Sequence, residues 1–154
     1  MKIVTIVVLS LTAFSQIDAR PIQEQDVPKV ITDTAEQTFS CAIKLGPKIE
    51  DVPVVYGNEL VPEDNDALNE LWHCIWEKKG IIDEDGDIVL DALNTYLRDL
   101  FAVTGKDQTA HRDLTSNIAQ NCKTDVESGE NEHMAVKLKN CIARGIEEFL
   151  FAEN

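Results

Sequence analysis

Apolar residues recur every three or four positions through most of the chain after residue 28, which is the spacing of one face of an α-helix. The clearest example is the segment DALNELWHCIWEKKG, which begins at Asp66. Its apolar face holds Leu68, Leu71, Trp72, Ile75 and Trp76. Residues 64–66 can cap the N-terminus, lysines suit the last turn, and Gly80 can end the helix. This segment is therefore predicted to be an amphipathic helix.

Three further helices are predicted on its C-terminal side. The first follows an acidic turn, continues until Gly105, and carries Leu90, Leu93, Leu97, Leu100 and Phe101 on one face. The second runs from about 107 to 122 and carries Ala110, Leu114, Ile118 and Cys122. The third runs from about 131 to 151 and carries Met134, Leu138, Cys141, Ile142, Gly145 and Phe149. An acidic loop near residue 130 separates the last two helices.

A weaker helix is predicted at the N-terminal side, over KVITDTAEQTFSCAIKLG. The residues expected to face inward are Ile31, Ala35, Phe39, Ala42 and Leu45. The next segment, 47–62, is broken by three prolines and a glycine, so it leaves room for one short helical piece. No stretch alternates apolar and polar residues as a strand does. We expect an all-α chain of five or six helices.

The start of the chain reads as a targeting segment. Lys2 precedes an uncharged apolar run that is too short to cross a bilayer as a helix, and the segment SQIDA then leads to Arg20. This pattern predicts a secretory signal peptide over residues 1–19, cleaved after Ala19, and a single helical domain over residues 20–154. The mature protein is expected to be secreted and extracellular.

Charge and cysteine content narrow the function classes. The formal net charge of −14 repels phosphate backbones and anionic lipid surfaces, which argues against nucleic-acid binding and against membrane association. No stable membrane insertion is expected, because no later run is apolar enough. The four cysteines are Cys41, Cys74, Cys122 and Cys141. In a secreted chain this even number predicts two disulfides, and the spacing alone leaves all three pairings open.

The acidic turn between two helices resembles a calcium loop at first sight. Asp83, Glu84, Asp85, Asp87 and Asp91 surround Gly86. An EF-hand loop needs glycine at its sixth position and a bidentate glutamate at its twelfth. If Asp83 is the first position, Ile88 is sixth and Asn94 is twelfth; if Gly86 is sixth, Ala92 is twelfth. Both registers fail, so we expect a solvated turn in which Gly86 relaxes the backbone and Asp87 caps the next helix.

No catalytic site or cofactor site is predicted. The histidines are His73, His111 and His133, and none has the sequence context of a hydrolase nucleophile or a zinc protease. His73 adjoins Cys74, but a cysteine in a disulfide is no nucleophile. We therefore expect a protein that is not an enzyme, with no metal and no cofactor.

The cysteine framework resembles that of the insect odorant-binding proteins, in their four-cysteine Minus-C branch. One cysteine lies late in a first helix, one lies in a middle helix followed by IWEKKGIIDEDGDI, and two lie in the last two helices. The common six-cysteine pattern would place the two missing cysteines at Glu70 and Glu132. Those two positions form a bridge in six-cysteine relatives, so the resemblance implies the pairs Cys41–Cys74 and Cys122–Cys141. If the two glutamates lie close together, their repulsion would loosen this junction.

The resemblance also implies a function. It implies a compact bundle of about six helices around an apolar cavity that carries small hydrophobic ligands, such as odorants or pheromones, through extracellular fluid. The residues expected to line the cavity are Leu71, Ile75, Trp76, Leu93, Leu97, Phe101, Ile118, Leu138, Ile142 and Phe149. Further candidate partners are a chemoreceptor and a second copy in a weak homodimer. The alternative is a secreted helical interaction or signalling protein with a solid core and no ligand cavity.

Overall fold

The computed structural model describes residues 28–53, 59–103, 108–129 and 132–151. Within these ranges the helices are α1 (Lys29–Leu45), the 3-10 helix η2 (Gly46–Asp51), α2 (Asp66–Lys78), α3 (Leu90–Ala102), α4 (Gln108–Glu127) and α5 (Met134–Phe151). The described part of the chain holds no strand, only one isolated antiparallel bridge between Ile82 and Ile88. The all-α prediction is confirmed. The predicted signal peptide and its cleavage site lie outside the described residues.

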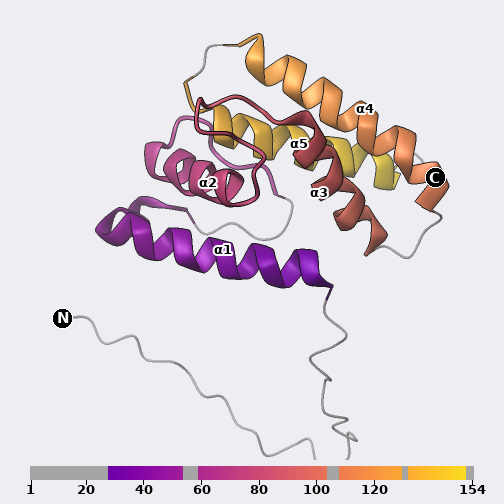
Figure 1. Cartoon of the computed structure of the whole chain (residues 1–154). Coiled ribbons are helices and arrows are strands. Elements are labelled where there is room, and N and C mark those ends of the chain that lie inside the picture. Colours follow the sequence, from indigo (N-terminus) through magenta and orange to yellow (C-terminus); the bar gives the residue numbers. More distant parts are fainter. Residues whose placement is uncertain (1–27, 54–58, 104–107, 130–131, 152–154) are drawn as a thin grey trace, which may run out of the picture.

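The helices form a bundle in which α5 lies between α2 and α4 (Figure 1). Helix α3 packs on α4, and α1 lies along one side of the bundle, in contact mainly with α2. The short helical piece predicted after the first helix is η2, which continues α1 directly. Helix α4 extends to Glu127, beyond the end expected at Cys122, and α5 begins at Met134 rather than near 131.

Helix α2 forms as its sequence predicts. The side chain of Asn65 caps it, with Oδ1 accepting a hydrogen bond from Leu68 N at 2.8 Å. The chain leaves the helix through Gly80, whose φ of 67° lies in the left-handed region that a residue with a side chain rarely adopts. The face expected to be apolar is buried, and Trp76 is its largest fully buried side chain.

The core is organised around Trp76. Its ring lies 5.1 Å from the ring centroid of Trp72 and 5.7 Å from that of Tyr96, the second contact being edge-to-face. The indole Nε1 donates a hydrogen bond to the carbonyl of Ala135 at 2.9 Å, so its one polar group is satisfied in the core. This bond joins α2 to the first turn of α5.

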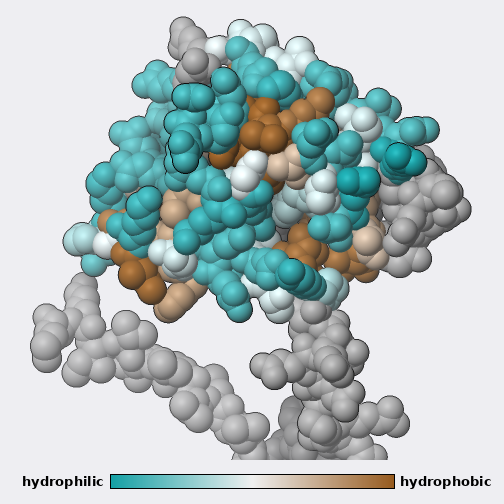
Figure 2. Space-filling model, viewed as in Figure 1, coloured by the Kyte–Doolittle hydropathy of each residue, from teal (hydrophilic) through white to brown (hydrophobic). Residues whose placement is uncertain are grey.

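The face assigned to α1 from its sequence is wrong over most of the helix, although Ala42 and Leu45 near its C-terminal end do pack against the core. Of the residues expected inside, Ile31 and Phe39 are 44% and 70% exposed and Ala35 is exposed, whereas Cys41 is buried. Cys41 must face α2 because it is bonded to Cys74, and two residues along a helix turn through about 200°, so Phe39 points to the opposite side. Figure 2 shows apolar atoms at the surface on the side where α1 lies, on a face that is otherwise mostly hydrophilic.

The acidic turn is a tight hairpin. Asp83 N donates to Asp87 O at 3.0 Å, and Asp83 Oδ1 accepts from the backbone N–H groups of Asp85 and Asp87 at 3.1 and 2.9 Å. Gly86 has φ 87°, as expected for a residue that relaxes the turn. The prediction that Asp87 caps the next helix is wrong, because α3 begins after Val89 without a side-chain cap. The carboxylate of Asp83 is used instead to close the hairpin itself.

Two disulfides join the helices in pairs. Cys41–Cys74 joins α1 to α2, and Cys122–Cys141 joins α4 to α5, which are the pairs that the resemblance implies. Close approach of α4 and α5 also requires Gly145, since a Cβ atom there would lie 2.9 Å from Ile118 Cγ2.

Helix α5 also holds the chain that leads to α2. The Asn140 side chain accepts from Val61 N and donates to Val61 O, both at 2.9 Å, as a neighbouring strand would. Lys139 Nζ donates to the carbonyl of Glu59. Both side chains are buried, so their polar groups are satisfied by this segment.

Candidate functional site

An open cleft lies between α1 and α3. Its volume is about 880 Å³, and the end of α2 closes one side of it. The lining residues are Pro28, Lys29, Val30, Asp33, Gln37, Lys78, Lys79, Asp91, Ala92, Thr95, Tyr96, Asp99, Ala102 and Val103. Apolar side chains therefore alternate with charged ones, and every contributing element belongs to the N-terminal part of the bundle.

Lys79 is fixed where the three helices meet. Its Nζ donates to Thr34 Oγ1 at 2.8 Å and lies 4.8 Å from the centroid of the Tyr96 ring. The Thr34 hydroxyl in turn donates to the carbonyl of Val30 at 2.6 Å, which orients its lone pairs toward the ammonium. The ammonium is thus held by α1 and α3 as well as by its own segment at the end of α2.

Burial changes the acid–base properties of this group. It lowers the pKa of Lys79 from its ordinary value, and the nearby carboxylate of Asp33 partly offsets this by raising it. Burial also raises the pKa of the Tyr96 phenol, and a hydrogen bond with Thr34 acts in the opposite direction. The cleft therefore has a partly desolvated cation beside an aromatic ring.

Gln37 contributes a second polar group, one helical turn beyond Thr34. Its Oε1 atom is buried and has no hydrogen-bond partner among the described residues. An acceptor in this condition is stabilised by any donor that reaches it.

The residues predicted to line a cavity do not line this cleft. Those whose side chains are described belong to the buried core: Leu71, Ile75, Trp76, Leu93, Leu97, Phe101, Ile118, Leu138 and Ile142. Phe149 lies outside the described side chains. The cleft and the buried core are in contact through Tyr96, which lines the cleft and whose ring packs on Trp76.

Sequence reasoning missed the polar residues of the cleft. The apolar stripe of α1 predicts a different inner face, which excludes Thr34 and Gln37. The signal that could have found them is the cysteine: Thr34 lies seven residues before Cys41, which is two helical turns and therefore the same face. Lys79 and Tyr96 carry no comparable signal, since only the packing brings them to Thr34.

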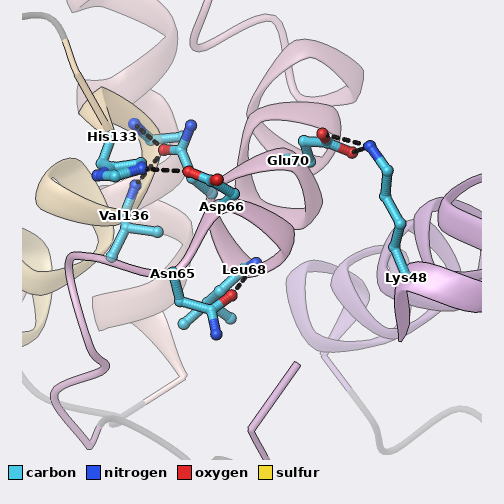
Figure 3. A network of polar contacts seen from close by, with 9 residues as sticks. Lys48, Asn65, Asp66, Leu68, Glu70, His133 and Val136 are labelled. Atoms are coloured by element: carbon cyan, nitrogen blue, oxygen red, sulfur yellow. Dashed lines mark hydrogen bonds and ion pairs between the residues drawn. The ribbon is translucent and has the colours of Figure 1, made fainter. Parts of the chain in front are cut away.

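The junction between α2 and α5 is closed by polar contacts (Figure 3). Asn69 Oδ1 accepts from the backbone N–H groups of Ala135 and Val136 at 3.1 and 3.3 Å, which caps α5 from a neighbouring helix. His133 Nε2 lies 2.7 Å from Asp66 Oδ1. These contacts involve the neighbours in sequence of Glu70 and Glu132, the two positions at which the resemblance would place a third bridge.

Glu70 takes part in a different contact. Figure 3 shows its carboxylate turned toward η2, where Lys48 Nζ lies 2.6 and 2.8 Å from its two oxygens. The interaction that the structure gives Glu70 is therefore an ion pair with Lys48 rather than repulsion from Glu132. Because both partners are about half exposed, this pair contributes little to stability.

The remaining candidate chemistry is sparse. In residues 28–53, 59–103, 108–129 and 132–151 no group of three or more His, Cys, Asp or Glu side chains could hold a metal ion. His73 lies 3.7 Å from Glu77 on the surface of α2, and the side chain of His111 is not described. None of the described helices is both long enough and apolar enough to cross a membrane.

Comparison with known proteins identifies the family. A sequence profile of the PBP/GOBP family matches residues 23–144, which include all five described α-helices in whole or in part and all four cysteines. No curated protein and no solved structure matches the chain at a significant level. The chain belongs to the PBP/GOBP family of insect odorant-binding proteins, and its two disulfides are consistent with the four-cysteine Minus-C type.

Proposed function

We propose that the chain is a secreted carrier that binds small hydrophobic molecules, such as odorants or pheromones, and transports them through extracellular fluid. PBP/GOBP proteins are non-enzymatic binding proteins, so no reaction on the ligand is assigned. The observation that carries the proposal is the cleft between α1 and α3, a space of about 880 Å³ within the range of small-molecule sites.

The ligand would lie against Tyr96, with the core behind it. Val30, Ala92 and Val103 offer apolar surface on the two sides of the cleft. Burial of the ligand's apolar surface would drive binding by roughly 25 cal/mol per Å² before the costs of association. Of the predicted cavity residues, Trp76 then lies directly behind the ring of Tyr96.

Helix α1 is suited to be a movable wall. Cys41 is the one buried residue among its described side chains, and the helix is attached through the disulfide to Cys74 and the Thr34–Lys79 bond. An element with few buried apolar contacts opens at a lower free-energy cost than the rest of a fold. A ligand could therefore widen the cleft without disturbing the core around Trp76.

Titration with an apolar fluorescent probe tests the proposal. N-phenyl-1-naphthylamine should bind in a saturable way and be displaced by aliphatic competitors, and the fluorescence of Trp72 and Trp76 should change as the probe reaches Tyr96. A signalling protein with a solid core should show neither effect.

Two substitutions on α3 locate the site. Thr95 and Arg98 are both exposed and share a hydrogen bond of 3.2 Å, but only Thr95 lines the cleft. Thr95→Phe should fill the cleft and weaken probe binding. Arg98→Phe loses the same hydrogen bond but should leave the affinity for the probe unchanged. Equal effects from both variants, or saturable binding that neither changes, would place the site elsewhere.

A further inference from the structure

We infer that this cleft selects amphipathic ligands with a carboxylate head, in which Lys79 binds the head and the apolar walls bind an aliphatic tail. The inference rests on the proposed function and names the ligand class of the same site. It is carried by the geometry around the ammonium of Lys79, which is fixed in position and has donors left for a ligand.

The position of the ammonium is determined by two contacts, one of which is anchored in turn. Thr34 Oγ1 accepts one of its hydrogen bonds, the Tyr96 ring lies beside it, and the Thr34 hydroxyl is itself anchored to Val30. A lysine ammonium has three donors, and the hydrogen bonds that Lys79 makes to the described residues use one of them. A carboxylate, with two oxygens, can accept from the remaining two.

Among the described residues the ammonium also has no ion-pair partner. Among the described carboxylates none forms an ion pair with Lys79, although Asp33 is near enough to affect its electrostatics. The other charged groups that face the cleft come from α1 (Lys29, Asp33), α2 (Lys78) and α3 (Asp91, Asp99). All but Asp33 are exposed, so they are better solvated than Lys79.

An anionic ligand should bind at the lysine whose ammonium has lost more of its hydration. The partly buried ammonium of Lys79 has lost water and gained one hydrogen bond and one aromatic contact, but no ion pair among the described residues. A carboxylate bound there replaces the hydration that the ammonium has lost. Water and salt screen the attraction between the two charges less at this position than at an exposed lysine. Lys78, on the adjacent residue but exposed, offers the same charge without this gain.

The aliphatic tail has a matching path. The cleft is also lined by Val30, Ala92, Ala102 and Val103, which offer apolar surface to the tail. An alcohol is the competing ligand, since a hydroxyl could donate to Gln37 Oε1. That oxygen is inaccessible to solvent in this form, whereas the ammonium lies in the wall of the cleft.

Calorimetric titration of the full chain with octanoate, octanol and methyl octanoate at neutral pH tests the inference. Octanoate should bind at least about tenfold more tightly than methyl octanoate, as expected for charge-assisted hydrogen bonds that the ester cannot accept equally well. Lys79→Met should abolish this preference, so that octanoate and methyl octanoate bind this variant with equal affinity. Lys79→Arg should keep most of the preference.

Lys78→Met is the matched control, because it removes the same charge from the neighbouring residue. It should retain the preference for octanoate, and Asp33→Asn should strengthen octanoate binding several-fold by removing a like charge. Equal affinities of acid and ester in the unchanged chain, tighter binding of octanol, or equal losses in the two lysine variants would overturn the inference. If the ester and the probe bind but the acid has no advantage, only this inference fails; if none of them binds, the proposed carrier function fails too.

Discussion

Replacing Asn69 by alanine should destabilise the fold by about 2 kcal/mol. Its Oδ1 is the acceptor for the N–H groups of Ala135 and Val136, two residues that are fully buried at the start of α5. A buried donor left without a partner costs about 1–3 kcal/mol, and the loss of a helix cap costs about 0.5–2 kcal/mol. The bonds of 3.1 and 3.3 Å are long and form one cap, so their losses do not add in full.

Urea unfolding followed by far-UV circular dichroism measures this change. For a chain of this size, about 2 kcal/mol corresponds to a fall in Tm of about 4–8 °C. Amide hydrogen exchange should accelerate at Ala135 and Val136 more than at Leu138, whose N–H lies beyond the unpaired first turn of α5.

Asn69→Asp is the matched control for this variant. It keeps an oxygen at the same place and adds a negative charge near the positive end of the α5 dipole, so it should retain most of the stability. If Asn69→Ala unfolds within about 0.5 kcal/mol of the unchanged chain, or if the aspartate variant is as unstable as the alanine variant, the capping argument is refuted.

Two further outcomes follow from the structure, and one, the third disulfide, follows from the resemblance to six-cysteine proteins. Calcium at millimolar concentration should leave the Tm unchanged, because Asp83 is engaged in its own turn and neither register supplies the twelfth ligand; a saturable increase in Tm would contradict this. Glu70→Cys combined with Glu132→Cys should form a third disulfide in oxidising buffer and raise the Tm, each single variant being the control; a pair that stays reduced would show that the positions are not neighbours. Trp76→Ala should cost about 3–5 kcal/mol and weaken probe binding, because Tyr96 loses the ring behind it; an unchanged probe affinity would assign Trp76 to the core alone.

Capping residues and apolar periodicity predict a helix correctly where both lie within one segment of the sequence. Helix α2 has its N-cap at Asn65, its apolar face at the predicted positions and its exit at Gly80, all within sixteen consecutive residues (65–80). The class of the fold and the family follow from such segments and from the cysteine spacing. In α1 the same reasoning chose the wrong face, because a disulfide to a distant helix determines which side is buried.

The cleft could not be predicted from the sequence, because it too depends on contacts between distant segments. Hydrophobic patterning selects residues that avoid water, and those residues pack on one another in the core around Trp76. The cleft depends on polar residues such as Thr34, Lys79 and Tyr96, which lie on three different parts of the chain. They meet because α1 packs on both α2 and α3, and no periodicity within one helix encodes this packing.

The arrangement of the two disulfides bears on how the chain folds as it is made. Each bridge closes its own stretch of chain, with separations of 33 and 19 residues, and the two stretches do not overlap. A ribosome delivers the cysteines in pairing order, so Cys41 meets its partner before Cys122 is synthesised. Short loops also close with the smallest entropy loss. Oxidative folding can therefore proceed vectorially, one covalent loop after the other, without the reshuffling of wrong pairs that interleaved bridges require.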